Sequence, residues 1–377
     1  MRISILSIIV PAILVGCSSG ETKFNSAPVE NVFPKIEHKS LSLEKMLLDS
    51  VNTSSFGESY ITNDNQIAFM DKHFCTLSKF DTSGHLINTR LGYGPGAGEL
   101  QIGRVAGQAY MEDGRLALLG YNLDFHVVSP DLKDKDIFVL DRIPNADLYQ
   151  SSLTYTNQYS DMVCRSYGNS VYFNVYSEHP NFNYLEHMDD YLNKCHHIWE
   201  IDINRKEDKG LLAPGYPESY YEEPYKNVPF LGTCFDIDNQ GNFYVKYDKD
   251  SLVYEYTHDF EPLKTYGYAG LDMNTDYIPI HSYKESRKNY RSERNNRGYY
   301  YWVEYVDETD LLFVSYRKDS EDSDGLQIYK NGQLIADVIV PKKFRVMGYI
   351  APYYYSYIIP LLDEEDDSLI MYRFKLE

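Results

Sequence analysis

Six short runs of β-branched and aromatic residues recur along the chain, and this repetition restricts the fold more than any other feature. The runs occupy residues 67–70, 116–119, 171–176, 243–247, 311–316 and 349–354. Residues of these types favour β-strands, and polar turns such as Asp113-Gly114 and Gly168-Asn169 precede several of the runs. The sequence therefore predicts an all-β protein built from a repeated cluster of strands.

A second strand-like segment and a polar turn follow each run. These segments occupy residues 77–86, 126–132, 197–203, 253–260, 327–334 and 368–374. Clusters recurring at roughly 40 to 70 residues are typical of a β-propeller, in which each blade is a small antiparallel sheet that needs neighbours to bury its faces. No βαβ alternation is visible. We expect a six-bladed β-propeller, with a pair of β-sandwiches or a β-helix as the alternatives.

The N-terminus has the pattern of a bacterial lipoprotein signal. Arg2 is followed by a short apolar stretch over residues 3–13, and the small-residue pattern of residues 14–17 resembles a lipobox that ends at Cys17. The stretch is shorter than the about 20 apolar residues of a transmembrane helix. We expect a signal peptide over residues 1–16, a flexible tether over residues 17–40 anchored by lipid on Cys17, and the propeller over residues 41–377.

Charge limits the partners of the folded part. The chain has a formal net charge of −20 at pH 7, which repels phosphate backbones and gives no general attraction to anionic lipid. We therefore expect no nucleic-acid partner, and we expect the membrane to be reached through the lipid on Cys17 alone.

Cysteine and histidine spacing gives no metal motif, and we expect no cofactor. The four cysteines after Cys17 are far apart, so either buried thiols or disulfides fit their spacing: Cys75, Cys164, Cys195 and Cys234. Four histidines gather in one acidic segment: His179, His187, His196 and His197. No fixed ligand spacing brings them together, and Leu185, Met188 and Leu192 are spaced as in a short amphipathic helix. We expect a surface helical insertion there.

One glycine-rich segment carries a family resemblance. Residues 79–86, followed by residues 91–100 with the sequence LGYGPGAGEL, resemble a stretch of the six-bladed β-propeller lipoproteins of Gram-negative gut bacteria, many of which are domains of unknown function. This chain differs by the insertion of Ala97-Gly98 before Glu99. The resemblance implies a fold and a location, not an activity. The glycines at 92–96 lack the Lys-Ser/Thr of a phosphate-binding loop, so we expect a crossover between blades that needs positive φ.

A basic and aromatic segment is the candidate ligand-binding site. Residues 283–302 carry six basic and two acidic residues up to Arg297, and three arginines share one face if the segment is helical. Guanidinium groups bind carboxylates, and aromatic rings stack on sugars. The candidate residues are Arg287, Arg291, Arg294, Tyr299, Tyr300 and Trp302. The alternative is an internal patch that neutralises carboxylates of the propeller itself.

These features favour a non-catalytic binding or scaffolding module at the cell envelope. We expect it at the outer membrane, on the periplasmic face or the cell surface, with a glycan, a peptide or an outer-membrane protein as partner. The alternative is a propeller hydrolase or lyase that acts on a glycan or lactone at the central channel. Close acidic residues lining that channel would favour catalysis, because such sites need paired carboxylates, whereas an apolar or aromatic channel mouth would favour binding.

Overall fold

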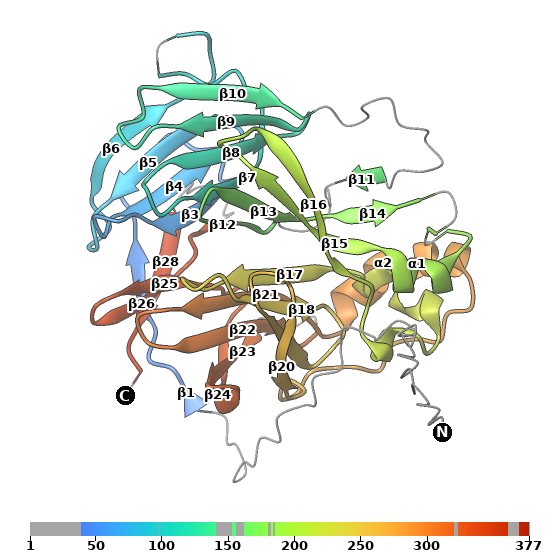
Figure 1. The fold of residues 1–377 in the computed structure, drawn as a ribbon. Helices are drawn as coiled ribbons and strands as arrows, with labels where there is room; N and C mark the ends of the chain where they lie inside the picture. The colour runs from blue at the N-terminus through green and yellow to red at the C-terminus, as the bar shows by residue number, and fades with distance from the viewer. Residues whose placement is uncertain are drawn as a thin grey trace, which may run out of the picture.

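The computed structural model describes residues 39–96, 98–140, 153–155, 162–179, 182–183, 185–319, 323–360 and 369–376. Cys17, the predicted signal peptide and most of the predicted tether lie outside these residues. Within the part of the chain that is described, six antiparallel sheets form the blades of a β-propeller around a central channel (Figure 1). The prediction of a six-bladed propeller is confirmed.

The first three blades follow one another along the chain. Blade 1 consists of β3 (Gly57–Ile61), β4 (Ile67–Asp71), β5 (Thr76–Phe80) and β6 (Leu86–Leu91). Blade 2 consists of β7 (Val105–Tyr110), β8 (Leu116–Gly120), β9 (Asp124–Val128) and β10 (Lys135–Val139). Blade 3 consists of β12 (Cys164–Tyr167), β13 (Ser170–Asn174), β15 (His196–Asp202) and β16 (Glu207–Pro214). A short pair of strands, β11 (Leu153–Tyr155) and β14 (Tyr176–Glu178), lies beside blade 3.

Blades 4, 5 and 6 complete the ring, and strands from the N-terminal part of the described chain join the last two of them. Blade 4 consists of β17 (Thr233–Ile237), β18 (Phe243–Tyr247), β19 (Leu252–Tyr256) and β20 (Pro262–Gly267). Blade 5 consists of β21 (Tyr299–Val306), β22 (Leu311–Arg317), β23 (Ser323–Lys330) and β24 (Gln333–Pro341), with β1 (Lys39–Ser40) parallel to β24. Blade 6 consists of β25 (Val346–Ile350), β26 (Tyr353–Ser356), β28 (Leu369–Phe374) and β2 (Glu44–Leu47), with β27 (Ile359–Pro360) beside β28.

The ring is closed by hydrogen bonds between its two ends. β2 forms the outer strand of blade 6 and pairs antiparallel with β28, so that Met46 lies opposite Met371. The innermost strand of blade 6, β25, contacts β3 of blade 1. The N-terminal strand β2 therefore holds the last blade in place.

The second strands of the blades account for the predicted runs. Five of the six runs overlap β4, β8, β13, β18 and β22, and the first four of these strands are buried at every position. A strand that is covered on both faces by neighbouring blades needs apolar side chains on both faces, and it therefore reads as a continuous apolar run.

The sixth predicted run is wrong as a single strand. Residues 349–354 contain the end of β25, a turn at Ala351-Pro352 and the beginning of β26, which together form a hairpin. Proline has no amide hydrogen for a strand ladder, so the turn at Pro352 fits its chemistry.

The glycine-rich crossover is confirmed. It links β6 of blade 1 to β7 of blade 2, and Gly92 has a φ of 141°. The Glu99 carboxylate accepts a hydrogen bond from the Gly96 amide at 2.8 Å, which fixes the turn.

The helices lie together at one end of the channel (Figure 1). They are α1 (Met188–Lys194), η1 (Glu218–Tyr220), η2 (Pro224–Phe230) and α2 (Tyr283–Asn296). All four helices lie in connections at the end of the ring where the first strands of the blades begin. They therefore cover that end of the ring. The expected insertion helix is α1, and it buries Met188 and Leu192. None of the helices in the described residues is long and apolar enough to cross a membrane.

Many tyrosines are buried, and their hydroxyl groups bond to the backbone. Tyr216 donates to the Leu231 carbonyl at 2.7 Å, and Tyr220 donates to the Phe230 carbonyl at 2.9 Å. Tyr216 precedes η1 and Tyr220 is its last residue, and both rings contact Tyr247 of β18. The phenol rings therefore fill the space between this insertion and blade 4 while satisfying backbone oxygens.

Candidate functional site

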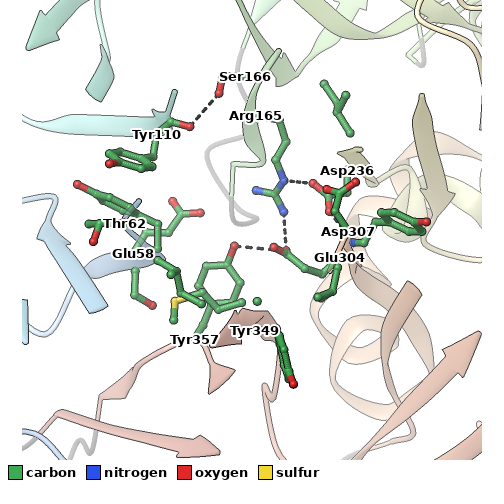
Figure 2. A pocket seen from close by; sticks show the side chains of 18 of the residues that line it. Glu58, Thr62, Tyr110, Arg165, Ser166, Asp236, Glu304, Asp307, Tyr349 and Tyr357 are labelled. Carbon is green, nitrogen blue, oxygen red and sulfur yellow. Dashed lines mark hydrogen bonds and ion pairs between the residues drawn. The ribbon is translucent and has the colours of Figure 1, made fainter. Parts of the chain in front are cut away.

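The first strands of the blades surround a cavity of about 460 Å³ at the end of the channel opposite the helices (Figure 2). This volume lies within the usual range for small-molecule sites. The charged and amide side chains that line it include Glu58, Gln108, Arg165, Asp236, Glu304 and Asp307. Tyrosines from four of the blades complete the walls: Tyr60, Tyr110, Tyr305, Tyr349 and Tyr357.

Arg165 lies in the middle of the cavity and binds two carboxylates (Figure 2). Its Nε donates to Asp236 Oδ1 at 2.5 Å, and its Nη2 donates to Glu304 Oε2 at 2.8 Å. The three residues come from β12, β17 and β21, the first strands of blades 3, 4 and 5. Arg165 therefore joins three blades at the channel axis.

Further donors hold the two carboxylates. Glu304 Oε2 also accepts from Trp302 Nε1 at 3.0 Å and from the Tyr357 hydroxyl at 3.4 Å. Asp236 Oδ2 accepts from the Tyr305 amide at 2.6 Å. This network fixes the orientation of both acids.

Burial raises the pKa of Glu304 well above its ordinary range, although the Arg165 guanidinium opposes the shift. The pKa of Asp236 is raised for the same reason. At the cavity rim, burial raises the pKa of Asp307 to about 6, and the nearby Asp238 carboxylate adds to the shift. The Asn239 amide, which donates to Asp307 Oδ1 at 3.0 Å, opposes it. The cavity is thus a place where ionised carboxylates are costly.

The opposite wall carries a second ion pair and a buried amide. Glu58 Oε2 lies 2.7 Å from Lys72 Nζ. Gln108 donates from Nε2 to the Glu58 carbonyl at 3.1 Å, which fixes its amide so that Oε1 is the remaining acceptor. Tyr60 and Tyr110 stack beside it with ring centroids 4.7 Å apart. These contacts connect blades 1 and 2 around the cavity.

The structure does not bring all the predicted site residues together. Arg287 and Arg291 lie exposed on α2, at the other end of the ring. Arg294 of the same helix points inward: it forms an ion pair with the buried Asp248, donates to the Pro229 carbonyl at 3.2 Å and lies 3.6 Å above the Tyr299 ring centroid.

The predicted aromatic residues are divided between two environments. Tyr299 contacts Arg294 near the helices, and Tyr300 is buried with its hydroxyl donating to the Tyr268 carbonyl at 2.9 Å. Trp302 is buried next to the cavity, where Arg165 lies 4.9 Å from its ring centroid. Of the six candidates, only Trp302 belongs to the network around the cavity.

Among the described residues, none of His179, His187, His196 and His197 lines the cavity. His197 is buried in β15, where its ring centroid lies 4.4 Å from that of Tyr216. Among the residues that the structure describes, no group of three or more His, Cys, Asp and Glu side chains is placed to hold a metal ion. In the same part of the chain, none of Cys75, Cys164, Cys195 and Cys234 forms a disulfide, and all four are buried.

The main residues of the cavity were not predicted from the sequence. None of Arg165, Glu304 and Glu58 is singled out by a sequence pattern. Asp236 lies near the end of β17, and a tight turn follows in which Asp238 Oδ1 accepts from the amides of Gln240 and Asn242. A useful signal is a charged residue in the short segment before an apolar run, because that segment is the first strand of a blade; β3, β12, β17 and β21 each carry one.

Solved structures of two other proteins have the same fold. A member of the DUF4221 family from Bacteroides vulgatus superposes with a TM-score of 0.68 at 12% identity, covering 91% of this chain and 98% of the other. A putative exported protein from Bacteroides fragilis superposes with a TM-score of 0.52 at 13% identity, covering 92% and 98%. The sequence matches no protein-family model and no curated protein. At these identities the likeness establishes the fold, in agreement with the expected resemblance to propellers of unknown function.

Proposed function

We propose that the protein is a lipid-anchored binding module of the cell envelope that holds a small polar ligand in the channel cavity. The observation that carries this proposal is the convergence of charged, amide and phenol groups from all six blades on one open cavity of about 460 Å³. In small-molecule sites, polar groups held in fixed positions orient the ligand and provide specificity, and this cavity is rich in such groups.

Binding fits the cavity better than catalysis does. The cavity contains both close acids and tyrosines, so the composition of its lining alone does not distinguish binding from catalysis. The two closest acids are separated by Arg165, which bonds to both, and Glu304 Oε2 accepts from three donors. A carboxylate that protonates or attacks a substrate must be free to reach the reacting atom. The oxygens held by Arg165 instead stabilise the channel and orient its lining.

The proposed location rests on the N-terminal sequence. Acyl chains on Cys17 would give stable attachment, because each buried methylene contributes about 0.8 kcal/mol. The propeller would then face the periplasm or the outside of the outer membrane. Metabolic labelling with an alkyne fatty acid tests this part: we expect label on the native chain and none on the C17A variant. An unlabelled native chain would refute anchoring.

Ligand binding in the cavity is tested by thermal shift with a fixed panel. The panel contains neutral hexoses, amino sugars, uronic acids, N,N′-diacetylchitobiose and tripeptides, each at millimolar concentration. Ser166 lines the cavity and donates to the Tyr110 carbonyl at 2.9 Å, so a Ser166→Trp side chain fills the space. We expect at least one probe to raise the Tm of the native protein and not that of S166W, and the chitobiose to be recovered intact. If no probe shifts the native Tm, or if S166W responds equally, the cavity is not the site.

A further inference from the structure

One acceptor in the cavity has no partner. Gln108 is 4% exposed, and its Oε1 makes no hydrogen bond in the described residues, although its Nε2 is fixed on the Glu58 carbonyl. A buried carbonyl oxygen without a donor is costly, by about 1–3 kcal/mol. Since Gln108 lines the cavity, a ligand that donates a hydrogen bond there would remove this cost.

Around the cavity, carboxyl groups outnumber the basic side chains that pair with them. Carboxyl groups are contributed by Glu58, Asp236, Glu304, Asp307 and Glu308. Two cations are paired with them: Lys72 with Glu58, and Arg165 with both Asp236 and Glu304. Among the described residues, no Lys, Arg or His lies within ion-pair distance of Asp307 or Glu308 at the rim. The cavity therefore has an excess of negative charge near its mouth, and it attracts cations and repels anions.

Donors are available as well, in smaller number. A guanidinium group has five N–H donors. Arg165 uses three of its own, toward Asp236, Glu304 and the Cys164 carbonyl. The remaining N–H groups need acceptors. A ligand hydroxyl fits between such donors and the carboxylate or amide acceptors, because it donates and accepts at once.

We infer that the ligand is a small hydroxyl-rich cation, an amino sugar in its ammonium form. This inference rests on the proposed function. The ammonium group has three donors and no acceptor, and it matches the rim carboxylates of Asp307 and Glu308, which form no ion pair with a described residue. The hydroxyl groups match Gln108 Oε1 and the remaining donors of Arg165. The tyrosine walls suit the apolar faces of a sugar ring.

Three hexose derivatives that differ in charge test the inference. Glucosamine is cationic, N-acetylglucosamine is neutral and glucuronate is anionic. We expect calorimetry at pH 7 and low ionic strength to show glucosamine binding at least about tenfold more tightly than N-acetylglucosamine, with no detectable binding of glucuronate. Raising the salt concentration weakens glucosamine binding and leaves the neutral sugar unaffected.

Two variants and a matched control test which side chains of the cavity recognise the sugar. Asp307→Asn removes one carboxylate and should weaken glucosamine binding about fivefold or more, without changing the affinity for N-acetylglucosamine. Gln108→Leu should weaken both sugars, because it removes the acceptor. Asp259→Asn is the control: Asp259 lies in the β19–β20 turn, outside the cavity, with 89% of its side chain exposed, and the change should have no effect.

The outcomes separate this inference from the proposed function. Equal affinities for the three sugars, tighter binding of glucuronate, or an equal loss in D259N would overturn the inference. If any of these sugars still binds and S166W abolishes the binding, the cavity remains a ligand site with a different preference. If none of the three binds, the amino-sugar inference is refuted, and the wider panel alone decides whether the cavity binds a ligand.

Discussion

Arg165 and Glu304 meet at the channel axis, with 2.8 Å between Nη2 and Oε2, although 139 positions separate them in the chain. The two residues belong to blades 3 and 5, which are not neighbours in the ring, and Asp236 of blade 4 completes the group. The side chains of all three are largely buried. The group therefore forms only when blades 3, 4 and 5 are packed together in the ring. The same contacts fix the side chains that line the cavity.

Replacing Arg165 by Met should destabilise the protein strongly. The change leaves two buried carboxyl groups without their cation, and breaking such a group typically costs about 3–5 kcal/mol. Urea unfolding at pH 8 measures the loss. At pH 5 the loss should be smaller, because the Arg165 guanidinium opposes the rise in the pKa of Glu304; without it, the folded variant takes up a proton more readily than the folded native protein does. Arg90→Met, on the exposed strand β6, is the control. A loss below about 1 kcal/mol at pH 8 would mean that the group does not support the ring.

The fold could be predicted because the second strands are buried on both faces. In β4 and β18, for example, every residue is buried, and the apolar runs at 67–70 and 243–247 are therefore continuous. The first strands give a weaker signal. β12 has only four residues, and Arg165 and Ser166 in its centre look like part of a loop. Their side chains face a polar channel, so their polarity is the consequence of their position.

The site could not be assembled from the sequence for a related reason. Glu58, Arg165, Asp236 and Glu304 approach one another only through the curvature of the ring, and no spacing in the chain encodes their distances. The basic segment at 283–302 was conspicuous because its residues are adjacent in sequence. The structure divides it at Gly298, so that α2 ends at one side of the ring while Trp302 lies beside the cavity.

Substitutions in β2 test ring closure. Met46 is 8% exposed and Leu47 is 61% exposed, because neighbouring residues of a strand point to opposite faces. Met46→Asp places a charge among apolar side chains and should lower the free energy of unfolding by about 3 kcal/mol or more. Leu47→Asp is the matched control and should change it by less than about 0.5 kcal/mol. Equal effects in chemical denaturation would mean that β2 does not hold blade 6.

Substitutions in α2 separate its arginines. Arg294→Ala leaves the buried Asp248 without its ion pair and removes the contact with Tyr299, so the free energy of unfolding should fall by about 2–4 kcal/mol. The double variant Arg287→Ala/Arg291→Ala changes only exposed positions and should leave the Tm within about 2 °C of the native value. Thermal unfolding of both variants at pH 7 measures the difference. A large loss in the double variant would indicate that the exposed arginines also support the fold.

The cavity rim should make stability depend on pH through Asp307. Burial and the neighbouring carboxylates raise its pKa from 3.8 to about 6, so between these values the native state holds a proton that the unfolded chain has lost. Stability therefore falls as the pH rises through this range. Asp307→Asn cannot ionise and can still accept from the Asn239 amide, so its Tm should exceed the native Tm at pH 8, and the difference should disappear at pH 4. The exposed Asp259→Asn should follow the native curve at both pH values. A difference in Tm between D307N and the native protein that stays constant with pH would refute this assignment. Only a group whose pKa differs between the folded and unfolded states produces a difference in Tm that grows as the pH rises.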